Sequence, residues 1–253
     1  RPPISTPLYS SAASDVYKRQ GGLPPFRTVA EIEAAIRRGG LSHEAELSLW
    51  DCLYLSPSEI ADIISVVRKN ARHEVSYLAH AVPAYTGIRR GELLRLQWVD
   101  IDFEHSTLIA RSRKQSRQVS ESKRRIDLHA ELTLILREWR AKRPKGQFVL
   151  CDDDSIDALT PSTANSRFWQ PLRGTRWCLN SRKNSFKIGF HTYRHSFASN
   201  LASRSVDQRI IDGWMGHQTE AMRERYRHLY PRDRQSAMQT FSLLTPTEQV
   251  AGA

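Results

Sequence analysis

Residues 86–94 read TGIRRGELL, and the prediction of the fold starts from this stretch. Gly87 and Gly91 bracket a turn, and the leucines after them predict a helix that continues through Trp98. The glycines therefore place Arg89 where a turn enters a helix. An arginine guanidinium carries a rigid fork of donors and stays charged at physiological pH, so Arg89 is a candidate to grip two oxygens of one phosphate.

A second group of basic side chains lies far along the chain, where residues 191–195 read HTYRH. His191 and Arg194 are three positions apart and therefore share one face of a helix. Two donors on one face can converge on a single anion.

A third motif, GWMGH at residues 213–217, presents His217 at a turn, and Tyr226 follows nine residues later. A phenol with a pKa near ~10 attacks phosphorus only when cations and hydrogen bonds stabilise its oxyanion and the charge that develops on the phosphate. Because Tyr226 follows two clusters of arginine and histidine, it is the candidate nucleophile.

A basic connection, RSRKQSRQVSESKRR, spans residues 111–125 and holds seven Lys and Arg against one acid, Glu121. We expect most of these charges to meet DNA phosphates. A lysine here could instead protonate a leaving oxygen, because an ammonium group is a compact donor on a flexible stem.

The overall composition limits the class of protein. The 253 residues include 38 Lys and Arg against 27 Asp and Glu, a net charge of +11 that favours polyanionic partners such as nucleic acid. No stretch approaches the roughly 18 consecutive apolar residues of a membrane span, so we expect a soluble protein. Three widely separated cysteines indicate neither a disulfide framework nor a zinc site, and they fit a reducing compartment.

Helical patterns dominate, and the sequence predicts a mainly α fold with a small antiparallel β-sheet (α+β). Short extended stretches at 107–111 and 124–128 predict a hairpin, and residues 148–151 predict a further strand. Ser56 and Glu59 form a capping pattern, which indicates that a helix and a domain begin there.

The predicted domain organisation has four parts. Within residues 1–20, the string SSAASDVYKRQ matches one translated frame of a transposon adapter used for DNA sequencing libraries, so we interpret this stretch as a sequencing artefact that is disordered. Residues 21–54 read as a linker or as the remnant of a truncated N-terminal DNA-binding region. Residues 55–243 form the predicted catalytic domain, and residues 244–253 form a tail.

Together the four motifs resemble those of the tyrosine recombinase, or phage integrase, family, over about residues 55–243. TGIRRGELL is similar to the first arginine motif of that family, and HTYRHSFAS is similar to its His-x-x-Arg motif. WMGHQ is similar to its Leu-Gly-His motif, and the segment around Tyr226 is similar to its nucleophile motif. The resemblance implies the tyrosine recombinase catalytic-domain fold.

The resemblance also implies a reaction and a role for each motif residue. Tyr226 attacks a scissile phosphate, which forms a 3′-phosphotyrosine and releases a 5′-hydroxyl. Attack by the hydroxyl of a partner strand then reverses this step. Arg89 and Arg194 clamp the non-bridging oxygens, and His217 donates a further hydrogen bond to the phosphate. His191 assists proton removal from Tyr226 or orients the phosphate. Neither a metal nor a cofactor is implied.

The family also uses a lysine in the turn between its second and third strands. Lys114 is our choice for this general acid, and Lys123 is its rival because the connection is long. Glu92 stands beside a predicted phosphate site, where repulsion is unfavourable, so we expect it to point inward and orient Arg89 or a backbone amide. Tyr193 and Tyr230 are interpreted as packing residues.

The resemblance implies double-stranded DNA as the partner and a homotetramer on that DNA, and the free chain is expected to be a monomer in solution. The expected location is the prokaryotic cytoplasm, in association with the nucleoid. Two other functions remain open from the sequence. One is a DNA-relaxing enzyme that resembles type IB topoisomerases, and the other is a basic DNA-binding module without catalytic activity.

Overall fold

The computed structural model describes most of the chain between residues 24 and 229, without the side chains of Arg113, Glu121 and Tyr226. The described ranges are 24–113, 121–142, 146–152, 155–180, 185–216 and 219–229. Lys114, His217 and Tyr230 lie outside these ranges, as do residues 1–20 and 244–253.

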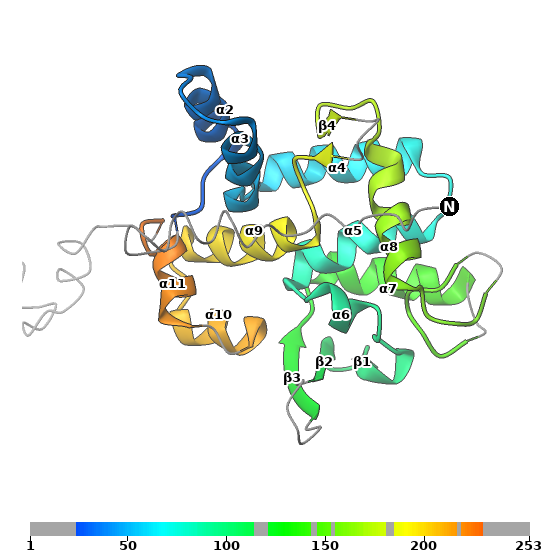
Figure 1. Cartoon of the computed structure of the whole chain (residues 1–253). Helices are drawn as coiled ribbons and strands as arrows, with labels where there is room; N and C mark the ends of the chain where they lie inside the picture. Colours follow the sequence, from blue (N-terminus) through cyan, green and yellow to red (C-terminus); the bar gives the residue numbers. More distant parts are fainter. Residues whose placement is uncertain are drawn as a thin grey trace, which may run out of the picture.

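Helices make up most of the described fold, and they gather around a central pair, α5 and α9 (Figure 1). No helix in these ranges is both long enough and apolar enough to cross a membrane. The helices are α2 (Val29–Arg37), α3 (His43–Leu49), η1 (Trp50–Cys52), α4 (Pro57–Asn70), α5 (Val75–Thr86), α6 (Arg90–Leu93), η2 (Trp98–Asp100), α7 (Ala130–Lys142), α8 (Pro161–Trp169), η3 (Gln170–Leu172), α9 (Phe190–Ala202), α10 (Gln208–Met215) and α11 (Glu220–Arg227).

Two small antiparallel sheets complete the described fold. The larger has the order β1-β2-β3, with a register that pairs Leu108 with Ile126, and the smaller pairs β4 with β5. The prediction of a mainly α fold with a small antiparallel sheet is confirmed. The predicted hairpin is present, with longer arms than expected. The strands are β1 (Ile101–Asp102), β2 (Thr107–Arg113), β3 (Glu121–Asp127), β4 (Cys178–Asn180) and β5 (Ser185–Phe186).

The start of α4 follows the local capping pattern. The backbone amide of Glu59 donates to Ser56 Oγ at 3.3 Å, and the backbone amide of Ser56 donates to Glu59 Oε2 at 2.7 Å. Pro57 occupies the first turn, where its missing N–H costs nothing. This capping box satisfies amides that have no partner inside the helix, so the predicted helix start is confirmed.

Helix α5 is buried over nine of its twelve residues and packs along α9. Tyr193 of α9 is fully buried, and its hydroxyl lies 2.8 Å from His80 Nδ1 of α5. The other ring nitrogen of His80 lies 2.9 Å from the carbonyl oxygen of Phe168. That oxygen only accepts, so His80 Nε2 carries the proton and Tyr193 donates to Nδ1. The interpretation of Tyr193 as a packing residue is confirmed.

Two local predictions were wrong, and one contact explains both. The helix that begins at α6 ends at Leu93, and residues 148–151 form isolated bridges instead of a strand. The amide of Trp98 donates to the carbonyl oxygen of Gln147, and the amide of Val149 donates to that of Leu96, both at 2.9 Å. This long-range pairing holds Gln97, between the two bonded amides and carbonyls, in an extended conformation that ends the helix, and the pairing is too short to make a strand.

The segment before α4 packs on the same core as the rest of the described chain. Ile32, Leu49 and Leu53 belong to the main hydrophobic cluster, and Phe26 belongs to a second cluster together with residues of α9 and α10. In Figure 1 the chain that leads into α2 passes beside α11. Residues 26–53 therefore contact the elements that carry the predicted site.

Candidate active site

Arg89 stands between α5 and α6, at a turn that only glycine fits. Gly87 ends α5 with a positive φ of 59°, and a Cβ there would lie 2.7 Å from Phe197 Cδ1 and 2.9 Å from Met215 Sδ. Glu92 holds Arg89 from the first turn of α6: it accepts the Arg89 backbone amide at 2.9 Å and Arg89 Nη1 at 3.1 Å. The Arg89 side chain remains 39% exposed, so its charge faces the surface.

Arg194 of α9 joins two helix ends. Its side chain is almost fully buried, and Nη1 donates to the carbonyl oxygen of Gly87 at 2.7 Å. Nη2 donates to the carbonyl oxygen of Met215, at the end of α10, at 2.6 Å. Both carbonyls carry the partial negative charge of a helix C-terminus, which favours a nearby cation. Arg194 thus ties the turn that bears Arg89 to the end of α10.

His191 lies one helical turn before Arg194 on α9 and is exposed at the surface. Neighbouring protein still removes part of the water around its ring, and this desolvation lowers the pKa of His191 from 6.5. The positive charges of Arg194, Arg90 and Arg89 lower that pKa further. At neutral pH the ring is therefore uncharged, which is the form that can accept a proton.

Glu92 is the centre of a buried ion-pair network. Arg124 of β3 grips it with both ends of its guanidinium, with Nη1 donating to Oε1 and Nη2 to Oε2, each at 2.7 Å. Ser112 of β2 donates to the same carboxylate. Burial alone raises the pKa of Glu92, but these hydrogen bonds and the charge of Arg124 outweigh it and lower the pKa to about 2. The prediction that Glu92 points inward and orients Arg89 is confirmed.

Arg124 also reaches the end of α10. Its Nε donates to the carbonyl oxygen of Trp214 at 2.7 Å, next to the Met215 carbonyl that Arg194 holds. Gly216 follows with a positive φ of 71°, and a Cβ there would lie 3.1 Å from Arg124 Cδ. Two arginines, one from the hairpin and one from α9, therefore fix the backbone just before His217, which itself lies outside the described residues.

Two charges of the basic connection face the protein instead of the surface, and the expectation that most of the seven meet DNA stays a prediction. Arg124 is largely buried against Glu92, and Arg111 Nε donates to Asp100 Oδ1 at 2.6 Å. These two arginines serve the interior of the fold. Sequence reasoning missed Arg124, although a signal was present: in a strand, Arg124 faces the same way as the buried Ile126, two positions on.

The two lysine candidates have different positions. Lys123 is exposed on β3, opposite Arg111 of β2, and Lys114 lies outside the described residues. The choice between them stays a prediction.

Tyr226 lies in α11, and its backbone places it one residue after a well-anchored arginine. Arg225 is buried, and Arg223 joins α11 to α10 through a 2.9 Å hydrogen bond from its Nε to Asp212 Oδ2. Helix α11 also packs on α9, which carries His191 and Arg194. The fold thus brings Arg89, His191 and Arg194 together and places the backbone of Tyr226 on a neighbouring helix.

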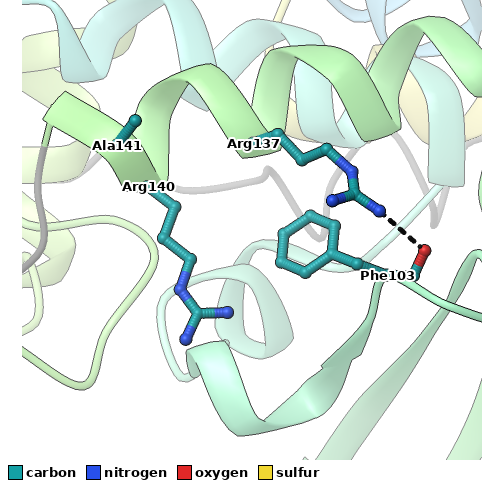
Figure 2. A pocket seen from close by; sticks show the side chains of 4 residues that line it. All are labelled: Phe103, Arg137, Arg140 and Ala141. Carbon is teal, nitrogen blue, oxygen red and sulfur yellow. Dashed lines mark hydrogen bonds between the residues drawn. The ribbon is translucent and has the colours of Figure 1, made fainter.

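A pocket of about 500 Å³ lies elsewhere, beside α7 (Figure 2). Arg137 and Arg140 line it, together with Phe103 and Ala141. Arg137 Nη2 donates to the carbonyl oxygen of Phe103 at 3.0 Å, and its guanidinium stands 4.9 Å from the centre of the Phe103 ring. No predicted site residue lines this pocket, so it is separate from the candidate active site.

Within the described ranges, no group of three His, Cys, Asp or Glu side chains could hold a metal ion.

Arg89, Arg194 and His191 lie together beside α11, the helix that carries Tyr226. This arrangement and the fold are those of the catalytic domain of a tyrosine recombinase. The chain belongs to the phage integrase family, whose model matches residues 54–232.

Named relatives agree with this assignment. A tyrosine recombinase XerC-like protein of Caldanaerobacter subterraneus subsp. tengcongensis is 26% identical over 181 residues, which are 62% of this chain and 46% of that protein. Tyrosine recombinase XerA of Pyrococcus furiosus is 26% identical over 195 residues, which are 75% of this chain and 62% of that protein. The chain therefore spans about half to two thirds of the length of these relatives.

Among solved structures, the integrase of the Tn1549 transposon in complex with a circular intermediate DNA has a similar fold. The TM-score is 0.56 at 15% sequence identity, and the match covers 82% of each chain. At this identity the likeness establishes the fold.

Proposed function

We propose that this chain carries the strand cleavage and rejoining site of a site-specific DNA recombinase or integrase. The observation that carries the proposal is the position of the Arg194 guanidinium. Its hydrogen bonds to Gly87 and Met215 gather the turn of Arg89, the helix of His191 and the end of α10 around one cationic centre. A phosphodiester is the anion that such a centre suits.

The proposed reaction is a transesterification at phosphorus. The Tyr226 oxygen forms a bond to the scissile phosphorus, the bond from phosphorus to the 5′ oxygen breaks, and the 5′ oxygen takes up a proton from Lys114 or Lys123. Arg89 and Arg194 stabilise the negative charge that grows on the non-bridging oxygens. Attack by a 5′-hydroxyl of a partner strand restores the phosphodiester and frees Tyr226.

Each remaining site residue has a proposed part in this reaction. His217 donates a hydrogen bond to the phosphate, and the two arginines that fix the backbone before it support this role. His191 receives the proton of Tyr226 or orients the phosphate, and the lowered pKa of His191 keeps its ring neutral, as either role allows.

The proposed partner is duplex DNA, and the proposed assembly is a homotetramer on that DNA. The net charge of +11 and the DNA complex of the Tn1549 integrase support the choice of DNA. An enzyme with this substrate would act at the nucleoid.

A trapping experiment tests the reaction. The probe is a library of duplexes with randomised sequence and a nick just 3′ of each candidate cleavage position, labelled at the 5′ end of the cleaved strand. Cleavage releases a short fragment that diffuses away, so the 5′-labelled strand stays bound to protein through its 3′-phosphate. We expect a covalent adduct that is absent in Tyr226→Phe.

The matched control is Tyr77→Phe. Tyr77 lies on α5, where its hydroxyl accepts a hydrogen bond from Arg68 at 2.6 Å. This variant removes a tyrosine hydroxyl away from the site and should keep the adduct. An adduct that persists in Tyr226→Phe, or its absence with the unaltered chain, would refute the proposed function.

A further inference from the structure

The residue just before the candidate nucleophile is held by the segment that precedes α4. Arg225 Nε donates to the carbonyl oxygen of Pro24 at 2.8 Å, and Nη2 donates to Cys52 Sγ at 3.4 Å. The Arg225 guanidinium lies 4.0 Å from the centre of the Phe26 ring, and the Phe26 amide donates to the Arg225 carbonyl oxygen at 2.9 Å. We call Pro24, Phe26 and Cys52 the clasp.

Burial makes this contact specific. Only 9% of Arg225 is exposed, and desolvation lowers the pKa of its guanidinium. Burial likewise raises the pKa of the Cys52 thiol, which favours its neutral form. A buried arginine is stable only where its donors find acceptors, and here they find a carbonyl oxygen, a sulfur and an aromatic face. Helix α11 therefore has one favourable position against the clasp.

The clasp also connects α11 to α9. The Phe26 ring lies 4.3 Å from the ring of His195, measured between centroids, and His195 lies one turn after His191 on α9. Phe26 is 1% exposed and shares a hydrophobic cluster with Ala198 and Met215. One aromatic ring thus lies between the arginine of α11 and the helix that bears two of the predicted site residues.

Consecutive residues of an α-helix point about 100° apart around its axis. Fixing the side chain of Arg225 therefore fixes the rotation of α11 about its axis. The same rotation sets the orientation of the backbone at residue 226.

We propose that Arg225 is a positioning residue, which the clasp uses to set the rotation of α11 for attack by Tyr226. This inference rests on the proposed function, because it takes Tyr226 as the nucleophile. Residues 24–54 then act in the reaction through α11. Loss of the clasp leaves the phosphate-binding residues in place and reduces the fraction of molecules in which Tyr226 is aligned with phosphorus.

The experiment measures covalent adduct formation in single turnover on the nicked duplexes recovered from the trapping library. For each variant of the full chain, the rate at saturating DNA and the DNA concentration for half the maximal rate are recorded. We expect Arg225→Ala to lower the saturating rate by about 10- to 100-fold, the range that misplacement of a reacting group produces. The half-maximal concentration should stay close to that of the control.

The matched control is Arg227→Ala, which removes the same charge from the same helix. The Arg227 side chain is 58% exposed, and its ion pairs are with Glu220 and Glu224 of α11 itself. This variant should cleave at the unaltered rate once DNA is saturating. Arg225→Lys should recover part of the rate, because an ammonium group can still reach one clasp acceptor.

A double-mutant cycle separates positioning from loss of stability. Phe26→Leu keeps an apolar side chain but removes the aromatic face from Arg225. Alone it should slow adduct formation, and combined with Arg225→Ala it should add little, since both changes break one contact. If the Arg225→Ala protein unfolds below the assay temperature, the saturating rate of Phe26→Leu alone tests the proposal. A slower rate supports it, and an unaltered rate refutes it.

The outcomes separate the two proposals. If the unaltered chain forms an adduct and Arg225→Ala forms it at the same saturating rate, or if Phe26→Leu and Arg225→Ala act independently, the clasp proposal is wrong. If the unaltered chain forms no adduct at all, the proposed function itself fails.

Discussion

Replacing Glu92 with glutamine removes the carboxylate charge that pairs with the Arg124 guanidinium. The carboxylate is 3% exposed, and its pKa is lowered from 4.5 to about 2. A difference of about 2.5 pKa units corresponds to about 3 kcal/mol of folding free energy at neutral pH. This agrees with the roughly 3–5 kcal/mol lost when one partner of a buried ion pair is removed. The free energy of unfolding of Glu92→Gln should therefore be about 3 kcal/mol lower than that of the unaltered chain at pH 7.

The pH dependence gives this prediction a definite sign. The pKa of Glu92 is depressed in the folded state, so its contribution is complete above 4.5, the usual pKa, and is lost as pH falls towards 2. The stability gap between the unaltered chain and Glu92→Gln should fall to under half by about pH 3. Urea unfolding at a series of pH values measures this gap, because urea, unlike guanidinium chloride, does not screen charges.

The control is Glu74→Gln. Glu74 pairs with Lys142 at 3.5 Å, and its side chain is 58% exposed, so the change should cost less than about 1 kcal/mol. A Glu92→Gln protein as stable as the control at pH 7, or a gap that does not narrow in acid, would refute the reasoning. Because Glu92 also holds Arg89, adduct formation by this variant should be slower than that of the control.

Two further predictions concern the turn at Gly87 and the general acid. Gly87→Ala should lower the unfolding free energy by about 2 kcal/mol or more, because the methyl group meets Phe197 and Met215 at 2.9 Å or less in a backbone of positive φ. Gly39→Ala has a φ of +72° and nothing within 4 Å, so it isolates the backbone cost, and equal losses in urea unfolding would contradict the steric account. For the general acid, Lys114→Ala should cleave ordinary DNA slowly. Its cleavage rate should recover on DNA with sulfur in place of the 5′ bridging oxygen, because a thiolate leaves without a proton. Lys123→Ala should cleave normally, and the reverse pattern in the same adduct assay would assign the role to Lys123.

Local patterns predicted much of the secondary structure because their causes lie within a few residues. The capping box of Ser56 and Glu59 is a contact three residues apart, and it starts α4 as predicted. The hairpin of β2 and β3 follows from alternation along two neighbouring stretches. The inward position of Glu92 was also predictable, because a carboxylate beside a phosphate site is repelled unless it binds a cation.

Contacts between distant residues were not predictable in this way. Residues 96–98 leave the helical pattern because they pair with residues 147–149, some fifty positions on. Arg124 looks like one more basic side chain of a DNA-binding connection, but the fold uses it to join Glu92 to the end of α10.

The amino-acid sequence by itself determined the family, the order of the motifs and the chemical type of each predicted site residue, since these depend on local spacing and side-chain chemistry. Only the tertiary structure decided which groups share a site. Arg194 meets the carbonyl oxygens of Gly87 and Met215, and Arg225 meets residues two hundred positions earlier in the chain. A buried guanidinium is stable only where several acceptors converge, and that convergence is a property of the packed chain.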